Sequence, residues 1–175
     1  MMNKGWKPLP VLLKIIFVIL AFRVFNSFFS LSFSFEQGFD FFGFTFYGLY
    51  AINVFTVVKI LVPIIILVEM FQRNSYTWIV AAIYFFLIAV SALLSLMNLT
   101  DMVGRIMEQM PEFFQVPEGI DENDYLAVIN TAFTFSVIFS AAFELAIMII
   151  FIVKRKYFSE YISDKKSLPE NDLPS

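Results

Sequence analysis

The chain has 175 residues, of which 59% are hydrophobic and only 15% are charged. Soluble domains are about 45–50% apolar and about 25% charged, so this composition predicts a lipid environment and excludes intrinsic disorder. The formal net charge of −3 argues against a nucleic-acid partner, and the absence of Cys and His removes disulfides, thiolate nucleophiles and histidine catalysis. We therefore expect a membrane protein that holds no metal or other cofactor.

Four stretches are long and apolar enough to cross the bilayer as helices, at about 10–32, 47–71, 76–98 and 125–153. A transmembrane helix needs about 20 apolar residues, and inside lipid only helices and closed barrels satisfy the backbone groups. We predict an all-α polytopic membrane protein, in which residues 1–156 form an antiparallel bundle of four transmembrane helices. Residues 157–175 are expected to form a partly disordered cytoplasmic tail.

The distribution of Lys and Arg outside the spans predicts the orientation of the bundle. Two of these cations precede the first span, one lies in the turn at 72–75 and five lie in the tail, whereas the opposite side carries only Arg105. Both termini should therefore be cytoplasmic, with the loops 33–46 and 99–124 outside. The partner that this layout implies is the lipid bilayer of the cell membrane.

The first outer loop is rich in phenylalanine, and several of its Phe residues alternate with other residues around Gln37-Gly38. Alternation around a glycine is typical of a β-hairpin. Helix ends that meet in an aromatic loop fit the same sequence pattern, because short apolar runs occur in both structures. We favour the second interpretation, with the loop on the membrane surface or over the end of the bundle.

The second outer loop begins with an amphipathic pattern over 99–110, in which apolar residues recur every three or four positions. We predict a helix that ends before Pro111 and lies in the interface or across the mouth of the bundle. Its Met-rich face is interpreted as a packing surface rather than a binding surface. Farther on, Asp124 is expected to cap the fourth span.

Three charged residues lie near the middle of their spans: Arg23, Lys59 and Glu144. A charge at the centre of a transmembrane helix costs roughly 2.5–3.5 kcal/mol, so each needs a partner or a cavity. With a rise of about 1.5 Å per residue, all three lie about 15–20 Å from the cytoplasmic boundary. Further polar residues follow these charges in the outer halves of the spans. The cytoplasmic halves of the spans are almost purely apolar. The predicted cluster of ligand-binding or packing residues is Arg23, Lys59, Glu144, Asn26, Asn53 and Ser140.

This cluster is compatible with three classes of function. We favour a structural or accessory membrane component without enzymatic activity, in which Glu144 pairs with Arg23 or Lys59. The alternative is a subunit that binds or transports a small anion or a lipid head group, because two cations and one anion leave one positive charge unless burial neutralises Lys59. An enzyme is disfavoured, since neither a Ser–His nor a Cys–His pair can form. Four helices would make a thin carrier, so a homo-oligomer or another membrane-protein partner is a further expectation.

Two segments of the chain resemble a broad group of small four-helix integral membrane proteins of bacteria and archaea. They are the turn EMFQRNSYTW at 69–78 and the exit of the last span, IIFIVKRKYF, at 149–158. The resemblance covers these segments and the general layout. It implies a four-helix membrane fold, and it assigns no activity to particular residues.

Overall fold

Residues 9–72, 74–109 and 121–158 are described by the computed structural model of the chain, and most of them are helical. Four helices are long and apolar enough to cross a membrane: Val11–Phe29, Gly48–Gln72, Thr77–Gly104 and Asn123–Val153. They confirm the four apolar helices predicted from the sequence. The predicted segments around Pro111 and after residue 158 lie outside the described residues.

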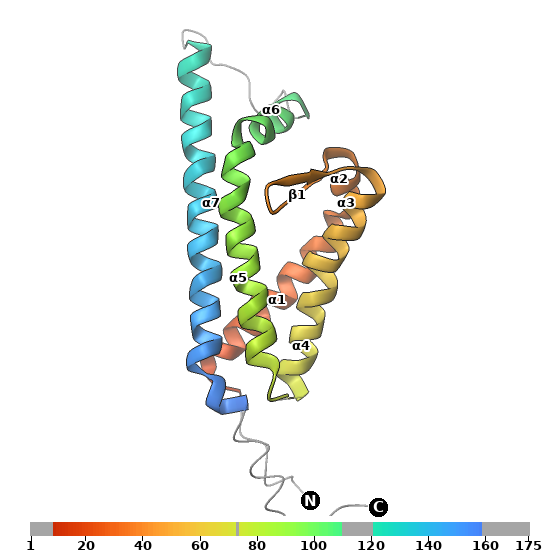
Figure 1. The fold of residues 1–175 in the computed structure, drawn as a ribbon, viewed down its shortest axis with the longest axis vertical. Helices are drawn as coiled ribbons and strands as arrows, with labels where there is room; N and C mark the ends of the chain where they lie inside the picture. Colours follow the sequence, from red (N-terminus) through yellow and green to blue (C-terminus); the bar gives the residue numbers. More distant parts are fainter. Residues whose placement is uncertain (1–8, 73, 110–120, 159–175) are drawn as a thin grey trace, which may run out of the picture.

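Figure 1 labels the α-helices from which the four long helices are built. The first is α1 (Val11–Phe29), and the second is continuous through α3 (Gly48–Phe55), the π-helical segment η1 (Thr56–Leu61) and α4 (Val62–Gln72). The third runs through α5 (Thr77–Ser95) and the 3₁₀ turn η2 (Leu96–Asn98) into the start of α6 (Leu99–Gln109), and the fourth is α7 (Glu122–Val153). The start of α1 and the end of α7 lie at the same end of the bundle, which we call the termini end (Figure 1).

The cap of α7 differs from the sequence-based expectation. The Asp121 side chain accepts a hydrogen bond of 2.8 Å from the backbone N–H of Asn123, so Asp121 is the N-cap. A capping side chain must precede the helix to reach the free N–H groups of its first turn. Asp124 lies inside that first turn, and its predicted capping role is wrong.

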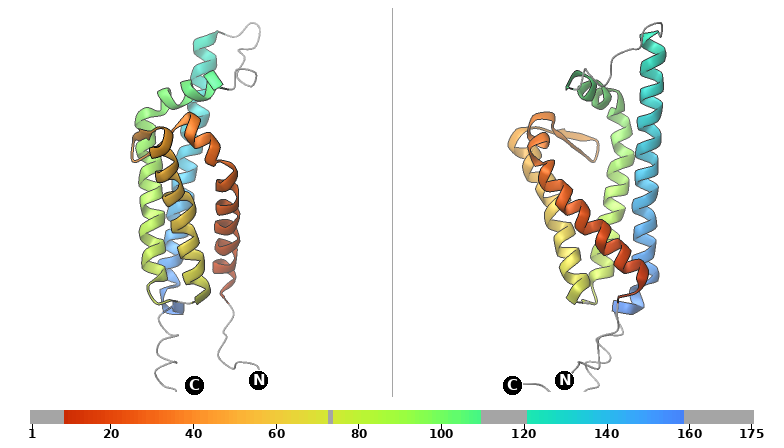
Figure 2. Two further views of the ribbon diagram at one scale, coloured as in Figure 1. Left: turned by 90° about the vertical axis from the view of Figure 1, so that its right-hand side faces the viewer. Right: turned by 180° about the vertical axis from the view of Figure 1, so that it is seen from behind.

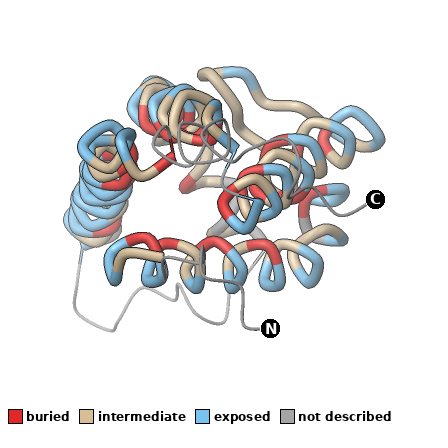
Figure 3. Tube along the Cα trace, turned by 90° about the horizontal axis from the view of Figure 1, so that it is seen from below, coloured by how far each residue is buried: buried red, intermediate tan, exposed pale blue. Residues whose placement is uncertain are grey.

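The helices surround a core that is concentrated at the termini end. α5 and α7 lie side by side along much of their length, and α1 crosses behind them from the base of α7 toward the top of α3 (Figure 2). Viewed along the bundle, the buried residues of α1 face inward and its exposed residues face outward (Figure 3). This core consists of Leu13, Ile16, Leu20, Ile66, Met70, Ala81, Phe85, Ile147, Phe151 and Phe158.

The opposite end carries a short helix, α2 (Leu31–Gln37), followed by a β-hairpin, and we call it the hairpin end. Strands β1 (Phe39–Phe41) and β2 (Phe44–Phe46) pair antiparallel, with Phe39 opposite Phe46. The interpretation of this segment as helix ends joined by a loop is therefore wrong after Gln37. The hairpin turns at Phe42-Gly43, whereas Gly38 joins α2 to β1.

Side chains of the third long helix hold the hairpin turn in place. Phe42 and Gly43 both have positive φ, at 52° and 74°, as the central residues of type I′ turns do. Positive φ is costly for a bulky residue, and two hydrogen bonds stabilise the turn. The Phe42 N–H donates to Ser91 Oγ at 2.9 Å, and Asn98 Nδ2 donates to the Gly43 carbonyl at 2.6 Å.

The segment after α5 forms a short 3₁₀ turn, η2 (Leu96–Asn98), and then a helix, α6 (Leu99–Gln109). α6 turns away from the axis of α5 and lies near α7 at the hairpin end (Figure 1). Val103 on its apolar face is 2% exposed, so this face packs against the protein. A helix thus occupies the predicted amphipathic segment, and its position in the membrane interface stays a prediction.

Gly38 is expected to be essential for the path from α2 into the hairpin. Its φ of 82° and ψ of 172° belong to a region that essentially only glycine adopts, and a Cβ would lie 2.8 Å from the Phe46 carbonyl oxygen. We expect Gly38→Ala to lower the free energy of unfolding by about 1–2 kcal/mol, measured by denaturation in mixed micelles followed by circular dichroism.

Gly104→Ala is the matched control for Gly38→Ala. Gly104 lies within α6, and no atom described in the structure would lie within 4 Å of an added Cβ. Because alanine favours a helix over glycine by about 1 kcal/mol, this variant should be neutral or stabilising. Equal losses of stability in both variants would contradict the role assigned to Gly38.

Candidate functional site

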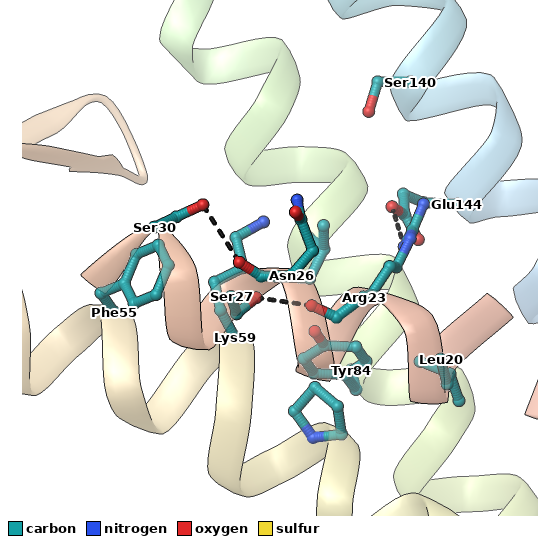
Figure 4. A pocket seen from close by; sticks show the side chains of 12 residues that line it. Leu20, Arg23, Asn26, Ser27, Ser30, Phe55, Lys59, Tyr84, Ser140 and Glu144 are labelled. Atoms are coloured by element: carbon teal, nitrogen blue, oxygen red, sulfur yellow. Dashed lines mark hydrogen bonds and ion pairs between the residues drawn. The ribbon is translucent and has the colours of Figure 1, made fainter. Parts of the chain in front are cut away.

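A polar cavity of about 300 Å³ lies between α1, the second long helix, α5 and α7 (Figure 4). It sits on the hairpin side of the apolar core, and Leu20 and Pro63 contribute to both its lining and the buried interior. The other apolar lining residues are Phe55 and Ile88. The polar lining residues are Arg23, Asn26, Ser27, Ser30, Lys59, Tyr84, Ser140 and Glu144.

An ion pair at one end of the cavity joins α1 to α7. Arg23 Nη1 donates to Glu144 Oε1 at 2.6 Å. Glu144 is 3% exposed, whereas the Arg23 side chain keeps 36% of its surface accessible. The Arg23 guanidinium also lies 5.5 Å from the centre of the Phe143 ring, a distance at which a cation and an aromatic face attract. Because the carboxylate is buried, removing its partner would cost more free energy than breaking an ion pair on the surface.

Lys59 reaches the same cavity from the second long helix, toward the end opposite the ion pair (Figure 4). Within the described residues, no hydrogen bond or ion pair of its amine is recorded. The carboxylate of Glu144 is bonded to Arg23 instead. The cavity lining therefore combines two basic side chains with one acidic side chain, and one of the two basic groups has no acidic partner of its own.

A change of helical register places Lys59. The segment Thr56–Leu61 is π-helical, a register in which an N–H bonds to the carbonyl five residues back, as the Val62 N–H does with Val57. In this register residue 63 would donate to the Val58 carbonyl, but Pro63 has no N–H.

Tyr84 on α5 replaces the missing donor. Its hydroxyl donates to the Val58 carbonyl at 3.0 Å. The contact gives the carbonyl a partner inside an apolar bundle, where an unsatisfied backbone group is costly. It also fixes α5 against the helix that carries Lys59. The sequence around Tyr84 gives no local signal that its hydroxyl bonds to the Val58 carbonyl.

The structure brings five of the six predicted cluster residues to this cavity. Arg23, Lys59 and Glu144 line it together with Asn26 and Ser140, both of which are exposed. Asn53 is also exposed, but it is not part of the lining. Lys59 lies within the π-helical segment Thr56–Leu61, whereas Asn53 lies in the α-helix before it, so regular α-helical spacing does not extend from one to the other.

Two other polar patterns of the spans have a structural explanation. Ser27 and Ser30 donate their hydroxyls to the carbonyls of Arg23 and Asn26, one turn earlier on α1. On the third long helix, Ser91 and Asn98 hold the hairpin turn rather than the cavity.

Comparison of the chain with protein-family models, curated proteins and solved structures finds no match. The resemblance of residues 69–78 and 149–158 to small four-helix membrane proteins therefore stays an expectation. The chemistry of the cavity has to be read from its own residues.

Proposed function

We propose that this chain is a multi-pass protein of the cell membrane that binds a small anionic group in the polar cavity. The distribution of Lys and Arg along the sequence supports an orientation with both termini cytoplasmic and the hairpin end outside. In this orientation the cavity belongs to the outer half of the bundle. The apolar core on its cytoplasmic side supports binding rather than passage across the membrane.

The observation that carries the proposal is the unpaired amine of Lys59 in a cavity that it shares with the Arg23–Glu144 pair. Removing an ion from water costs several kcal/mol, which a partner of opposite charge offsets. Glu144, the only carboxylate that the described residues bring to the lining, already accepts from Arg23. An anion between Lys59 and Arg23 would give the amine a partner, and a singly charged anion would make the charge of the occupied site neutral.

The donors of the cavity suit a phosphate or a carboxylate. Arg23 uses Nη1 for Glu144, and the remaining N–H groups of its planar guanidinium can bind oxygen atoms in pairs. Lys59 contributes three N–H donors, and the Asn26 amide adds two. Ser27 and Ser30 donate to backbone carbonyls, which supports a binding role over a nucleophilic one. We propose no catalytic step.

A second candidate is a structural or accessory membrane component in which the network only fixes the helices. The 2.6 Å bond between Arg23 and Glu144 favours it, because this contact ties α1 to α7 at the level where the cavity begins. In this case the occupant of the cavity would be water, and homo-oligomers or other membrane proteins would be the partners.

Lys59→Met separates the two candidates. In a neutral detergent, we expect inorganic phosphate to raise the thermal unfolding midpoint of the full-length chain, and isothermal titration should show one site per chain. Binding to the variant should weaken at least tenfold, or about 1.4 kcal/mol, because the amine is lost while the methylene volume is kept.

Lys14→Met is the matched control, since Lys14 is an exposed cation on α1 that does not line the cavity. It should bind phosphate as tightly as the parent chain. If phosphate and acetate both leave the parent chain unaffected, anion binding is wrong and the structural candidate remains. Equal weakening by both lysine variants would indicate general charge attraction and would also contradict the cavity site.

A further inference from the structure

The polar cavity opens sideways, between α1 and α7. Asn26 on α1 and Ser140 on α7 line it and are exposed, which places its mouth between these two helices. The helices meet at the termini end and at the Arg23–Glu144 pair. They diverge toward the hairpin end, as the view from behind shows (Figure 2, right).

The route from the hairpin end is covered by aromatic rings. Phe55 lines the cavity and is 7% exposed, and its ring packs edge-on against Phe39 of the hairpin, with 5.2 Å between ring centres. The bonds of the hairpin turn to Ser91 and Asn98 hold this cover in position. With Leu20 and Pro63 toward the termini end, the side between α1 and α7 is the accessible one.

Exposed phenylalanines neighbour, in the sequences of α1 and α7, the residues that line this lateral mouth. Phe22 and Phe29 precede and follow the polar stretch of α1 and are 68% and 65% exposed. Phe139 and Phe143 lie beside Ser140 and Glu144 in the α7 sequence and are 75% and 36% exposed. In a transmembrane bundle these apolar surfaces face acyl chains. The mouth thus combines basic and amide donors inside with apolar rings outside.

We propose that the anionic group is the phosphate of a membrane lipid, which enters the cavity sideways between α1 and α7 while its acyl chains stay against the phenylalanine rim. The inference rests on the proposed anion site and adds the chemical class of its ligand. A lipid phosphate is already in the membrane beside the mouth. A free ion from water would have to pass either the aromatic cover or hydrocarbon.

Four ligands that differ in whether they carry a phosphate, a glycerol and acyl chains test the inference. Each is titrated into the full-length chain in a neutral detergent. The probes are inorganic phosphate, glycerol 3-phosphate, dihexanoyl phosphatidic acid and dihexanoylglycerol, the last of which has chains but no phosphate. We expect phosphatidic acid to bind at least tenfold more tightly than the two free phosphates, or about 1.4 kcal/mol. Dihexanoylglycerol should bind less tightly than phosphatidic acid by a similar factor.

Ser140→Phe tests the position of the mouth. The exposed site on α7 accommodates a larger side chain, and the ring would narrow the gap to α1. Ser136→Phe is the matched control, because Ser136 is exposed one turn away on α7 and does not line the cavity. Phosphatidic acid binding should fall at least tenfold in the first variant and stay unchanged in the second, and Ser136→Phe should also bind inorganic phosphate as the parent chain does.

The outcomes distinguish the lipid inference from the anion site on which it rests. If phosphatidic acid binds no more tightly than inorganic phosphate, or if Ser140→Phe leaves it unaffected, lateral lipid entry is wrong and the anion site stands. If dihexanoylglycerol matches phosphatidic acid, recognition of the phosphate is wrong. If none of the phosphate-bearing probes binds, both proposals are overturned.

Discussion

Arg23→Met is expected to lower the free energy of unfolding by roughly 3 kcal/mol, the lower end of the range for breaking a buried ion pair. The loss arises on the other partner, because Glu144 would remain 3% exposed without the 2.6 Å bond to Nη1. Its second carboxylate oxygen, Oε2, already has no hydrogen-bond partner among the described residues. The lower end applies because the Arg23 side chain keeps 36% of its surface exposed.

The double variant Arg23→Met/Glu144→Leu should recover most of this stability, since an apolar pair leaves no buried charge behind. Lys14→Met makes the same chemical change at an exposed position of α1 and should cost less than about 0.5 kcal/mol. Denaturation in mixed micelles measures all three. A double variant as unstable as Arg23→Met would mean that the loss comes from packing of the arginine stem and not from the stranded carboxylate.

The shared depth of the midspan charges could be predicted because it follows from the rise of a helix and the cost of a charge in lipid. Arg23 and Glu144 are 121 positions apart in the chain. Both could be recognised because each is a charged residue within an apolar span, where water does not solvate it. Counting residues from the apolar boundaries was sufficient to place both near one level. The choice between Arg23 and Lys59 as the partner of Glu144 depends on side-chain geometry, which the sequence does not contain.

The position of the hairpin turn could not be predicted from the local sequence. Phenylalanines alternate on both sides of Gly38 and of Gly43, so local pattern gives two equivalent turns. The turn at Gly43 is selected by Ser91 and Asn98, which lie 49 and 55 residues from their partners in the turn. Contacts at such separations cannot be read from the sequence of the loop itself.

Asn53 shows how one backbone feature changes a site prediction. Its place in the cluster assumed regular α-helical spacing from Asn53 through Lys59. The π-helical segment Thr56–Leu61 interrupts that spacing with a longer hydrogen-bonded turn. In this segment the Val58 carbonyl depends on a hydroxyl donor from another helix, Tyr84, which is 26 residues from Val58 in the chain.

Tyr84→Phe is expected to lower the free energy of unfolding by about 2–3 kcal/mol, because the Val58 carbonyl would lose its donor in an apolar bundle. The ring and its packing on Phe85, at 5.1 Å between ring centres, are kept in this variant. The effect should therefore report the hydroxyl alone. Phosphate titration should weaken in parallel, since the same bond fixes the helix that presents Lys59.

The effect of Tyr84→Phe should depend on Pro63. Pro63→Ala restores the backbone N–H that the π register directs at the Val58 carbonyl, so Tyr84→Phe should cost less than about 0.5 kcal/mol in this background. A double-mutant cycle measures the difference as a coupling energy of about 2 kcal/mol between Tyr84 and Pro63. Additive losses would show that Tyr84 stabilises α5 by another contact, and that the proline does not create the need for its hydroxyl.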